Sequence, residues 1–551
     1  MKRILIAFSL LSVFAFSSCK KESLNIINPN EPTLAALNSE TGITNFALGI
    51  INKQLGNVIN AGTVNLFFIG YLHHSCMGDE YMMPYGNWGV RWSNQVFSVK
   101  PPSAAAPIVN PFGVTQYQSL LGFNSRPAGD RNAFLYEWFW AYNYIATSNT
   151  LLSAVQSPDL ALSGDAATKK ALLKAWALWW KGYAYSRVGS MYLAGLKVDQ
   201  AGSTNPDYVT NVQMITEANR ILDECATTLG GITANSDYND LFMKITPSFN
   251  FDSDAPNAAE VVTPAQWIRT INTIKARNLL VNKKTADMTA ADWNAILALT
   301  NNGVQATDNV FKWGMTADGV NDVSANFYHP MAIIGTNNEF AFVSERLMQE
   351  FKTGDNRLNN FTLRDLADRY PPNIRSRGLQ FGTRWAVNNI EDGGKYATNN
   401  NEGLVKFAGS YEENELTKAE CLINTGNIVG GLAIVDAIRR YQNAGLPAVA
   451  GAGLTLAEAK EELRRERRVA LFQRGTSFYD ARRWGVTKPV AQGGGRADGS
   501  VYLPTSLLGG GATVPDVRPC LMDYSYVDYF DVPANELDFN APSAISAPVK
   551  N

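Results

Sequence analysis

Cysteine and histidine are scarce in this sequence, which limits the chemistry that it can support. The 551 residues include five cysteines and three histidines, and no CxxC pair indicates a zinc ribbon or a redox site. His73-His74 and Asp79-Glu80 are close in sequence. No two histidines are spaced i, i+4 on a helix, however, so we expect no metal site. We predict buried free thiols at Cys76, Cys225, Cys421 and Cys520.

An excess of one charge and the common catalytic motifs are also absent. Lys and Arg number 48 against 50 Asp and Glu, so nothing indicates a partner made of nucleic acid. The sequence has no GxSxG elbow, no HExxH and no phosphate loop. A glycoside hydrolase would need two carboxylates at a fixed separation, and Asp79, Glu80, Glu391 and Asp392 are candidates by composition only. We expect a protein that is not an enzyme and holds no cofactor.

The N-terminus is typical of an exported lipoprotein. Lys2 and Arg3 precede an apolar run from Ile4 to Phe16 that is too short for a permanent membrane anchor. Ser17-Ser18-Cys19 then resembles a lipobox, which predicts Cys19 as the acylated mature N-terminus. The alternative is an ordinary secreted protein with a spare cysteine. We assign residues 1–18 to the signal, 19–40 to a lipid-anchored tether and 41–551 to a single domain.

Most of the remaining chain has helical periodicity. Helices are expected over Thr44–Asn60, Val64–His74, Asn132–Val155, Asp165–Leu196, Val212–Leu229, Trp267–Val281, Thr289–Leu299 and Glu415–Ala444, the last broken at Gly426 and Gly430-Gly431. The hairpins share no fixed 34-residue period, so the pattern predicts a divergent tetratricopeptide-like scaffold. Two irregular, loop-rich insertions interrupt it at about 79–130 and 301–414, and the chain after Gly485 is expected to be loop-like.

The segment from Thr455 to Gly485 has the most specific local pattern. Thr455 and Glu458 form a capping box at the start of a helix. Glu466 and Arg467 fall where the apolar stripe should continue, so we expect an ion pair to face the core there. Gly475 is predicted to end the helix in the left-handed conformation, and Thr476 to cap a short second helix. Such a unit is most often a packing element without a ligand.

The same segment resembles the C-terminal signature of the SusD/RagB family of outer-membrane nutrient-binding lipoproteins. The resemblance rests on Glu466, Arg467, Arg468, Gly475, Phe478, Asp480, Arg483, Trp484 and Gly485. Further matches are KAWALWWKGYAYSRVGSMYLAG, the segment Leu347–Arg357 before Asp355 and Arg357, and Asp531–Leu537. For Asp355 and Arg357 we favour a structural pair at a turn.

The resemblance implies a function and a location. It implies a mainly α, SusD-like fold on the cell surface, anchored by lipid in the outer membrane. The protein would capture an oligosaccharide, or a peptide, and deliver it to a SusC-like TonB-dependent barrel. One alternative is a helical-repeat scaffold that binds only proteins, and a less favoured one is a glycoside hydrolase.

Ligand-binding residues are chosen on chemistry alone, since the resemblance supplies none. The loop over 79–92 is rich in rings that can stack on sugar faces and in polar groups that can bond hydroxyls. The candidates are Tyr81, Tyr85, Trp88, Arg91 and Trp92, followed by Trp313 and Tyr328. The alternative is that these rings fold back as a small core beneath the loop.

Overall fold

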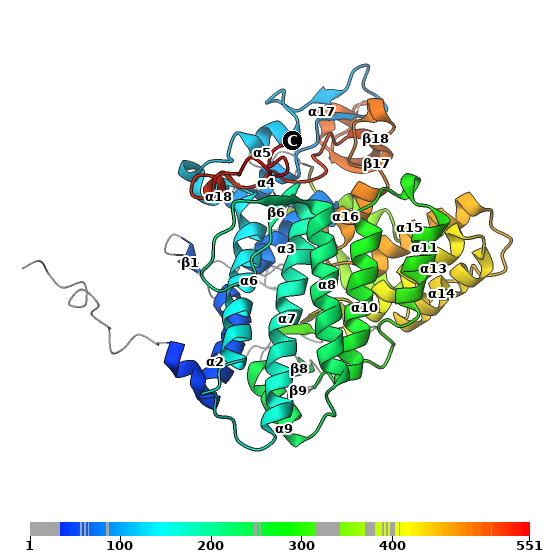
Figure 1. Ribbon diagram of the computed structural model, residues 1–551. Coiled ribbons are helices and arrows are strands. Elements are labelled where there is room, and N and C mark those ends of the chain that lie inside the picture. The colour runs from blue at the N-terminus through cyan, green and yellow to red at the C-terminus, as the bar shows by residue number, and fades with distance from the viewer. Residues whose placement is uncertain are drawn as a thin grey trace, which may run out of the picture.

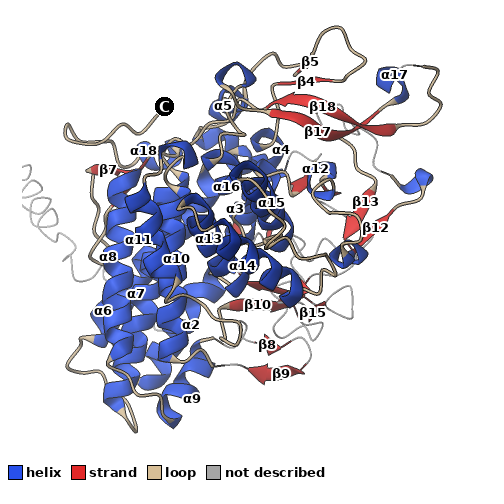
Figure 2. Cartoon of the chain, turned by 90° about the vertical axis from the view of Figure 1, so that its right-hand side faces the viewer, coloured by secondary structure: helices blue, strands red, loops and turns tan. Residues whose placement is uncertain are grey.

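The computed structural model describes residues 34–551, apart from 56–57, 60–61, 64–65, 84–86, 247–250, 253–254, 260, 316–341, 370–378, 380, 388–390, 393–394, 397–402, 407 and 509. The predicted signal, Cys19 and most of the tether lie outside this range. The described chain is mainly α, with short strands grouped beside the helices (Figures 1 and 2). Within these ranges, no helix combines the length and the apolar character needed to cross a membrane.

The helices are named by their position in the chain. They are η2 (Leu34–Asn38), α2 (Glu40–Leu55), α3 (Leu66–Met77), η3 (Asn87–Gly89), α4 (Val90–Ser93), α5 (Gln116–Leu121), η4 (Arg126–Arg131), α6 (Leu135–Val155), α7 (Ala166–Met191), α8 (Asn211–Gly230), α9 (Ser236–Ile245), α10 (Pro264–Val281), η5 (Thr285–Asp287), α11 (Ala290–Thr300), α12 (Glu345–Met348), η6 (Asn356–Asn360), η7 (Leu366–Asp368), α13 (Tyr411–Asn424), α14 (Ile428–Tyr441), α15 (Leu456–Ala470), α16 (Ser477–Arg483), η8 (Val490–Gln492), α17 (Thr505–Leu508) and α18 (Ala534–Leu537).

Local capping signals start several of these helices. Capping boxes with both hydrogen bonds present begin α5, α8, α10, α11 and α15. The predicted box of Thr455 and Glu458 is among them. Each box satisfies amide groups that the first helical turn would otherwise leave without a partner. The positions of these helix starts therefore follow from residues three apart in sequence.

The long helices pack in sequence as hairpins. Helix α6 packs on α7, α7 on α8, and α10 on both α8 and α11, and these helices stand side by side in Figure 1. Helices α13 and α14 form a further hairpin that turns at Gly426, whose φ is 96°. The predicted mainly α architecture of divergent helical hairpins with irregular insertions is confirmed.

The predicted break at Gly430-Gly431 is wrong, because both glycines lie inside α14. An added Cβ at Gly431 would lie 2.5 Å from Ile423 and 2.7 Å from the carbonyl oxygen of Ala419. Glycine is needed here for the close approach of two helices and not to end one of them.

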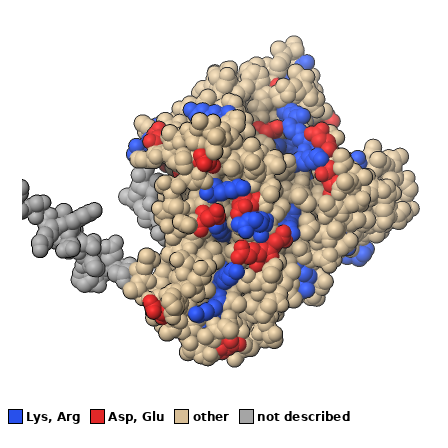
Figure 3. All heavy atoms as spheres, viewed as in Figure 1, with Lys and Arg blue, Asp and Glu red and all other residues tan. Residues whose placement is uncertain are grey.

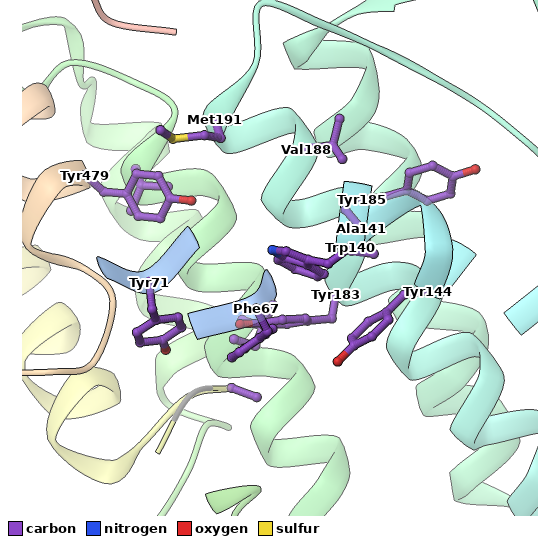
Figure 4. Packing of buried hydrophobic residues seen from close by; sticks show 14 of the residues in the cluster. Phe67, Tyr71, Trp140, Ala141, Tyr144, Tyr183, Tyr185, Val188, Met191 and Tyr479 are labelled. Atoms are coloured by element: carbon purple, nitrogen blue, oxygen red, sulfur yellow. The ribbon is translucent and has the colours of Figure 1, made fainter. Parts of the chain in front are cut away.

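A group of aromatic side chains fills the junction of α3, α6 and α7 (Figure 4). Phe67 of α3 lies 5.1 Å from Trp140 of α6, measured between ring centroids, and Trp140 lies 5.2 Å from Tyr144. The sequence predicts an apolar stripe on α7, but the helix is buried on nearly every side from Leu172 to Met191. This central helix belongs to a hydrophobic cluster that runs from Ile43 to Val532. The four predicted thiols are confirmed as free and buried.

Buried ion pairs surround α15, although not in the predicted pairing. Glu466 and Arg467 are both buried. Glu466 pairs with Arg357 and Arg439, whereas Arg467 pairs with Asp480. Adjacent residues on a helix point about 100° apart, so the two side chains meet different neighbours.

The turn after α15 differs from the prediction in two respects. Gly475 has the predicted left-handed φ, 68°, but it does not end the helix, because α15 ends at Ala470 and Leu471 is its C-terminal cap residue. Thr476 precedes α16, but its side chain makes no capping hydrogen bond.

Strands replace the loops that we expected after Gly485. Strands β17 (Arg496–Leu503) and β18 (Asp516–Asp523) pair antiparallel, and the sheet continues through β4 (Ser98–Lys100) and β5 (Ile108–Val109). This sheet lies at the upper right of Figure 2. The sheet joins strands near residue 100 to strands near residue 500, and no local sequence pattern reveals a pairing over that distance.

The other strands are short and form two-stranded sheets. They are β1 (Val58–Ile59) with β2 (Gly62–Thr63), β3 (Tyr81–Met82) with β11 (Phe342–Val343), β6 (Ala194–Leu196) with β7 (Tyr208–Thr210), β8 (Phe251–Asp252) with β9 (Ala255–Ala259), β10 (Lys312–Met315) with β16 (Gly403–Lys406), β12 (Phe361–Leu363) with β13 (Trp385–Val387), and β14 (Glu391–Asp392) with β15 (Lys395–Tyr396).

Candidate ligand-binding surface

The predicted ligand residues do not share one surface. Tyr81, Trp88 and Arg91 are 2%, 5% and 9% exposed, whereas Trp92 is half-buried. Tyr85 and Tyr328 lie outside the described residues. Trp313 is opposite Val405 in the β10–β16 pair, and its side chain is outside the described part of the chain.

Tyr81 and Trp88 are core side chains, which corrects their selection as stacking platforms. The ring of Tyr81 packs on Phe472 at 5.5 Å between centroids, and its hydroxyl bonds to Gln473. A ring that is at most 5% exposed has no face left for a sugar. For Tyr81 and Trp88, the structure agrees with the alternative expectation, in which the rings fold back as a small core beneath the loop.

Trp88 and Gly89 have an unusual backbone conformation. Trp88 and Gly89 have φ values of 53° and 69°, both left-handed. A Cβ on Gly89 would lie 2.5 Å from the carbonyl oxygen of Arg131, so only glycine fits. For a residue other than glycine such a conformation is strained, and the surroundings must maintain it.

His73 of α3 holds this segment in place. One ring nitrogen bonds the hydroxyl of Ser93 at 3.0 Å, and the other bonds the carbonyl oxygen of Trp88 at 3.1 Å. Burial lowers the pKa of His73 to about 4. The imidazole is therefore neutral at physiological pH, and it positions α4, where Trp92 is located.

Trp92 meets two phenylalanines that the sequence analysis did not select. Its ring lies 5.3 Å from Phe112 and 5.1 Å from Phe123, between centroids. The Arg131 guanidinium lies 5.2 Å from the centre of the Phe123 ring. Phe112 is 46% exposed, and Trp92 and Phe123 are half-buried. We call Trp92, Phe112, Phe123 and Arg131 the Trp92 surface.

Arg91 supports the Trp92 surface from within. Its guanidinium carbon lies 3.7 Å from the centre of the Trp92 ring, and Arg91 is buried. The sequence predicts that Arg91 contacts ligand directly. Because Arg91 is buried, its guanidinium stacks on the Trp92 ring instead. The local signal for the missed residues is an aromatic residue beside a glycine, at Phe112-Gly113 and Gly122-Phe123, within a surface segment.

A further exposed ring lies at the other end of η4. Phe539 is 78% exposed, and the Arg126 guanidinium lies 4.6 Å from its centroid. The Asn132 amide donates to Asn535 at 3.0 Å, which ties the α18 segment to η4. Exposed rings and arginines thus occur on both sides of η4.

Solved structures share this architecture. A SusD-like carbohydrate-binding protein from Bacteroides fragilis NCTC 9343 superposes with a TM-score of 0.58 at 12% identity, covering 92% of this chain and 99% of that one. The surface glycan-binding protein A from Bacteroides uniformis gives 0.55 at 13% identity, with 92% and 99% covered. This chain has the SusD-like fold. A structure described with xylogluco-oligosaccharide gives 0.50 at 13% identity, again with 92% and 99% covered. No family model and no curated protein sequence matches the chain.

Asp79 and Glu80, which precede the Trp92 surface in sequence, are buried and interact with arginines. Asp79 pairs with Arg346 at 3.0 Å and Arg496 at 3.1 Å. Burial alone would raise the pKa of Asp79, but these arginines outweigh it and lower the pKa to about 2. Burial raises the pKa of Glu80 to about 7, partly offset by Arg468. Both carboxyl groups are buried, so they offer no exposed acid–base pair for hydrolysis.

The second candidate carboxylate pair, Glu391 and Asp392, lies in a short strand, β14. Both side chains are outside the described part of the chain. In the part of this SusD-like chain that the structure describes, no group of three His, Cys, Asp or Glu side chains could hold a metal ion.

The helical face of the SusD-like fold differs from the Trp92 surface. Charged side chains of both signs lie together over α7 and α8 (Figure 3). Salt bridges on these helices and the neighbouring α10 are Lys174–Glu224, Arg220–Glu217 and Lys275–Asp223. A mixed-charge face is typical of solvated helices and of polar protein contacts.

Proposed function

We propose that this protein is a cell-surface lipoprotein that captures an oligosaccharide and delivers it to a SusC-like TonB-dependent transporter. The observation that carries the proposal is the SusD-like fold with a partly exposed aromatic cluster, the Trp92 surface, on its irregular side. The neighbours described as carbohydrate-binding and glycan-binding proteins support the same ligand class.

The chemistry of the Trp92 surface suits a sugar. Aromatic rings pack against the C–H faces of a pyranose, and guanidinium groups donate hydrogen bonds to hydroxyl oxygens. Phe112 and Trp92 supply rings, and Arg131 supplies donors at the edge. Because His73 and Gly89 hold α4, the Trp92 ring is preorganised, which reduces the entropy lost on binding.

The membrane anchor and the transporter contact belong to the proposal as well. Acylated Cys19 would tether the domain to the outer membrane through the polar segment before residue 40. The mixed-charge face of α7 and α8 is the surface that we assign to the barrel. A peptide is the second ligand class. Its aromatic side chains can stack on the rings of the Trp92 surface, and its backbone carbonyl groups can accept hydrogen bonds from the arginine there.

A binding experiment tests the proposal. The protein without residues 1–19 is screened against a panel of neutral oligosaccharides, and hits are measured by calorimetry. Phe112→Ala is expected to weaken binding about fivefold, in line with ~1 kcal/mol for one stacking ring. Phe139→Ala is the matched control, because Phe139 is 40% exposed on α6. Equal effects of the two substitutions would place the ligand elsewhere.

Co-expression with a barrel and an assay for cleavage separate the alternative functions. Association with a co-expressed SusC-like barrel, without binding of any glycan or peptide, would favour a scaffold that binds only proteins. Cleavage of a bound oligosaccharide would favour a hydrolase.

A further inference from the structure

Trp484 is a large ring that the hydrophobic core does not use. It follows α16 as the C-terminal cap residue and is half-buried. Within the described residues, it belongs to neither of the two hydrophobic clusters. The guanidinium of Arg483 lies 4.7 Å from its ring centroid. Tryptophan is enriched at interfaces, so a half-exposed ring outside the core is a candidate ligand contact.

Trp484 lines a cleft of about 220 Å³ between α13, α15 and η5. Ala457 and Leu463 of α15 supply apolar walls, and Lys460 and Asn424 supply polar groups. The volume exceeds that of several water molecules, at ~30 Å³ each. It is below the ~300–1,000 Å³ typical of sites for drug-sized ligands. A single sugar ring fits this volume.

The charges that line the cleft leave one cation available. Glu420 accepts two hydrogen bonds from Arg483, at 2.5 and 2.7 Å. Arg464 is held by Glu350 at 2.7 Å and by Glu461 at 2.7 Å. Lys460 is exposed and makes no salt bridge to any residue that the structure describes. The cleft thus offers one ring face and one cation, Lys460, that has no salt bridge to a described residue, whereas the other lining charges, Glu420, Glu461 and Arg464, are paired.

We propose that this cleft binds one sugar residue that carries a carboxylate, a hexuronate, with its ring on Trp484 and its carboxylate on Lys460. The proposal rests on the proposed function only in taking the ligand to be a sugar. The cleft and the Trp92 surface share no residue. A glycan with both neutral and acidic residues would then have two separate sites on this protein.

The experiment compares two monosaccharides that differ at one group. Galacturonic acid and galactose are titrated by NMR, at millimolar concentration and neutral pH, into the protein without residues 1–19. The variants are Lys460→Gln, Trp484→Ala and Trp484→Phe. The matched control is Lys244→Gln, because Lys244 is an exposed lysine on α9. Thermal unfolding of each variant reports whether the fold is intact.

The proposal predicts a specific pattern. Galacturonic acid binds more tightly than galactose, and Lys460→Gln lowers its affinity about fivefold, while Lys244→Gln leaves it unchanged. Trp484→Ala lowers the affinity about tenfold, and Trp484→Phe restores most of it. Absence of galacturonate binding, or equal affinity in Lys460→Gln and Lys244→Gln, would overturn the proposal.

A cross-test keeps this proposal separate from the Trp92 surface. Phe112→Ala is expected to leave galacturonate binding unchanged. If neutral oligosaccharides fail to bind while galacturonic acid binds in a manner dependent on Lys460, the Trp92 surface is refuted and the cleft is supported. The opposite result supports the Trp92 surface and refutes the cleft.

Discussion

Glu466 of α15 accepts hydrogen bonds from the guanidinium of Arg357 at 2.6 and 3.2 Å, although 109 residues separate them in sequence. Arg357 is also held by Asp355, and Glu466 by Arg439. Burial alone would raise the pKa of Glu466, but Arg357 and Arg439 outweigh it and lower the pKa. The predicted pair of Asp355 and Arg357 is thus one part of a larger buried network.

Removal of the Glu466 carboxylate is expected to destabilise the fold strongly. Glu466→Ala leaves two buried arginines without this partner, and breaking a buried pair costs ~3–5 kcal/mol. Urea unfolding measures the change in the free energy of unfolding. Glu461→Gln is the control, because the side chain of Glu461 is 53% exposed and its pair should contribute less than ~1 kcal/mol. Similar losses in both variants would contradict the network's role.

Trp88→Ala and Trp92→Ala should affect different properties. Trp88 is buried in the core, so its truncation should cost ~3–5 kcal/mol of stability. Trp92→Ala should weaken oligosaccharide binding about fivefold with a smaller effect on stability. Thermal unfolding and calorimetric binding of the two variants separate these outcomes. Trp88→Ala with wild-type stability would show that the ring is not a core element.

Glu80 is expected to make the stability depend on pH near neutrality. Burial raises its pKa from 4.5 to about 7, so the folded state holds a proton that the unfolded state has lost. The folded protein should therefore lose stability as pH rises from 4.5 through 7, and Glu80→Gln should remove this loss. Relative to wild type, the variant should gain up to ~3 kcal/mol between about pH 5 and about pH 8.

Urea unfolding of both proteins at the two pH values measures that gain. The difference between variant and wild type isolates Glu80 from other groups that titrate in the same range. A difference that stays constant with pH would show that the carboxyl ionises normally.

Gly89→Ala should disturb the support of the Trp92 surface. The substitution places a Cβ 2.5 Å from the Arg131 carbonyl oxygen and also strains a φ of 69°. Gly202→Ala is the matched control, because Gly202 has a φ of 70° with no atom within 4 Å of an added Cβ. Both variants incur ~1–2 kcal/mol of backbone strain. Only Gly89→Ala should also weaken oligosaccharide binding, and it should accelerate hydrogen exchange over residues 88–93. Identical behaviour of the two variants would contradict the proposed contact.

Local sequence determined the helical part of this protein. Thr263 with Gln266, and Thr455 with Glu458, start helices through bonds between residues three apart. The apolar residues of α13 and α14, and the left-handed turn at Gly426, likewise involve near neighbours. Helix starts, turns and amphipathic faces depend on such short-range interactions, so they can be read from the chain order.

Tertiary structure decided which rings are core and which form a surface. Trp88 and Trp92 are four residues apart in one aromatic loop, yet the first is buried and the second meets Phe112 and Phe123. In the same way, β18 pairs with β4 across more than 400 residues, and Glu466 finds Arg357 rather than its neighbour Arg467. The burial of a ring and the partner of a charge depend on which distant segments pack against them, and no local periodicity records that packing.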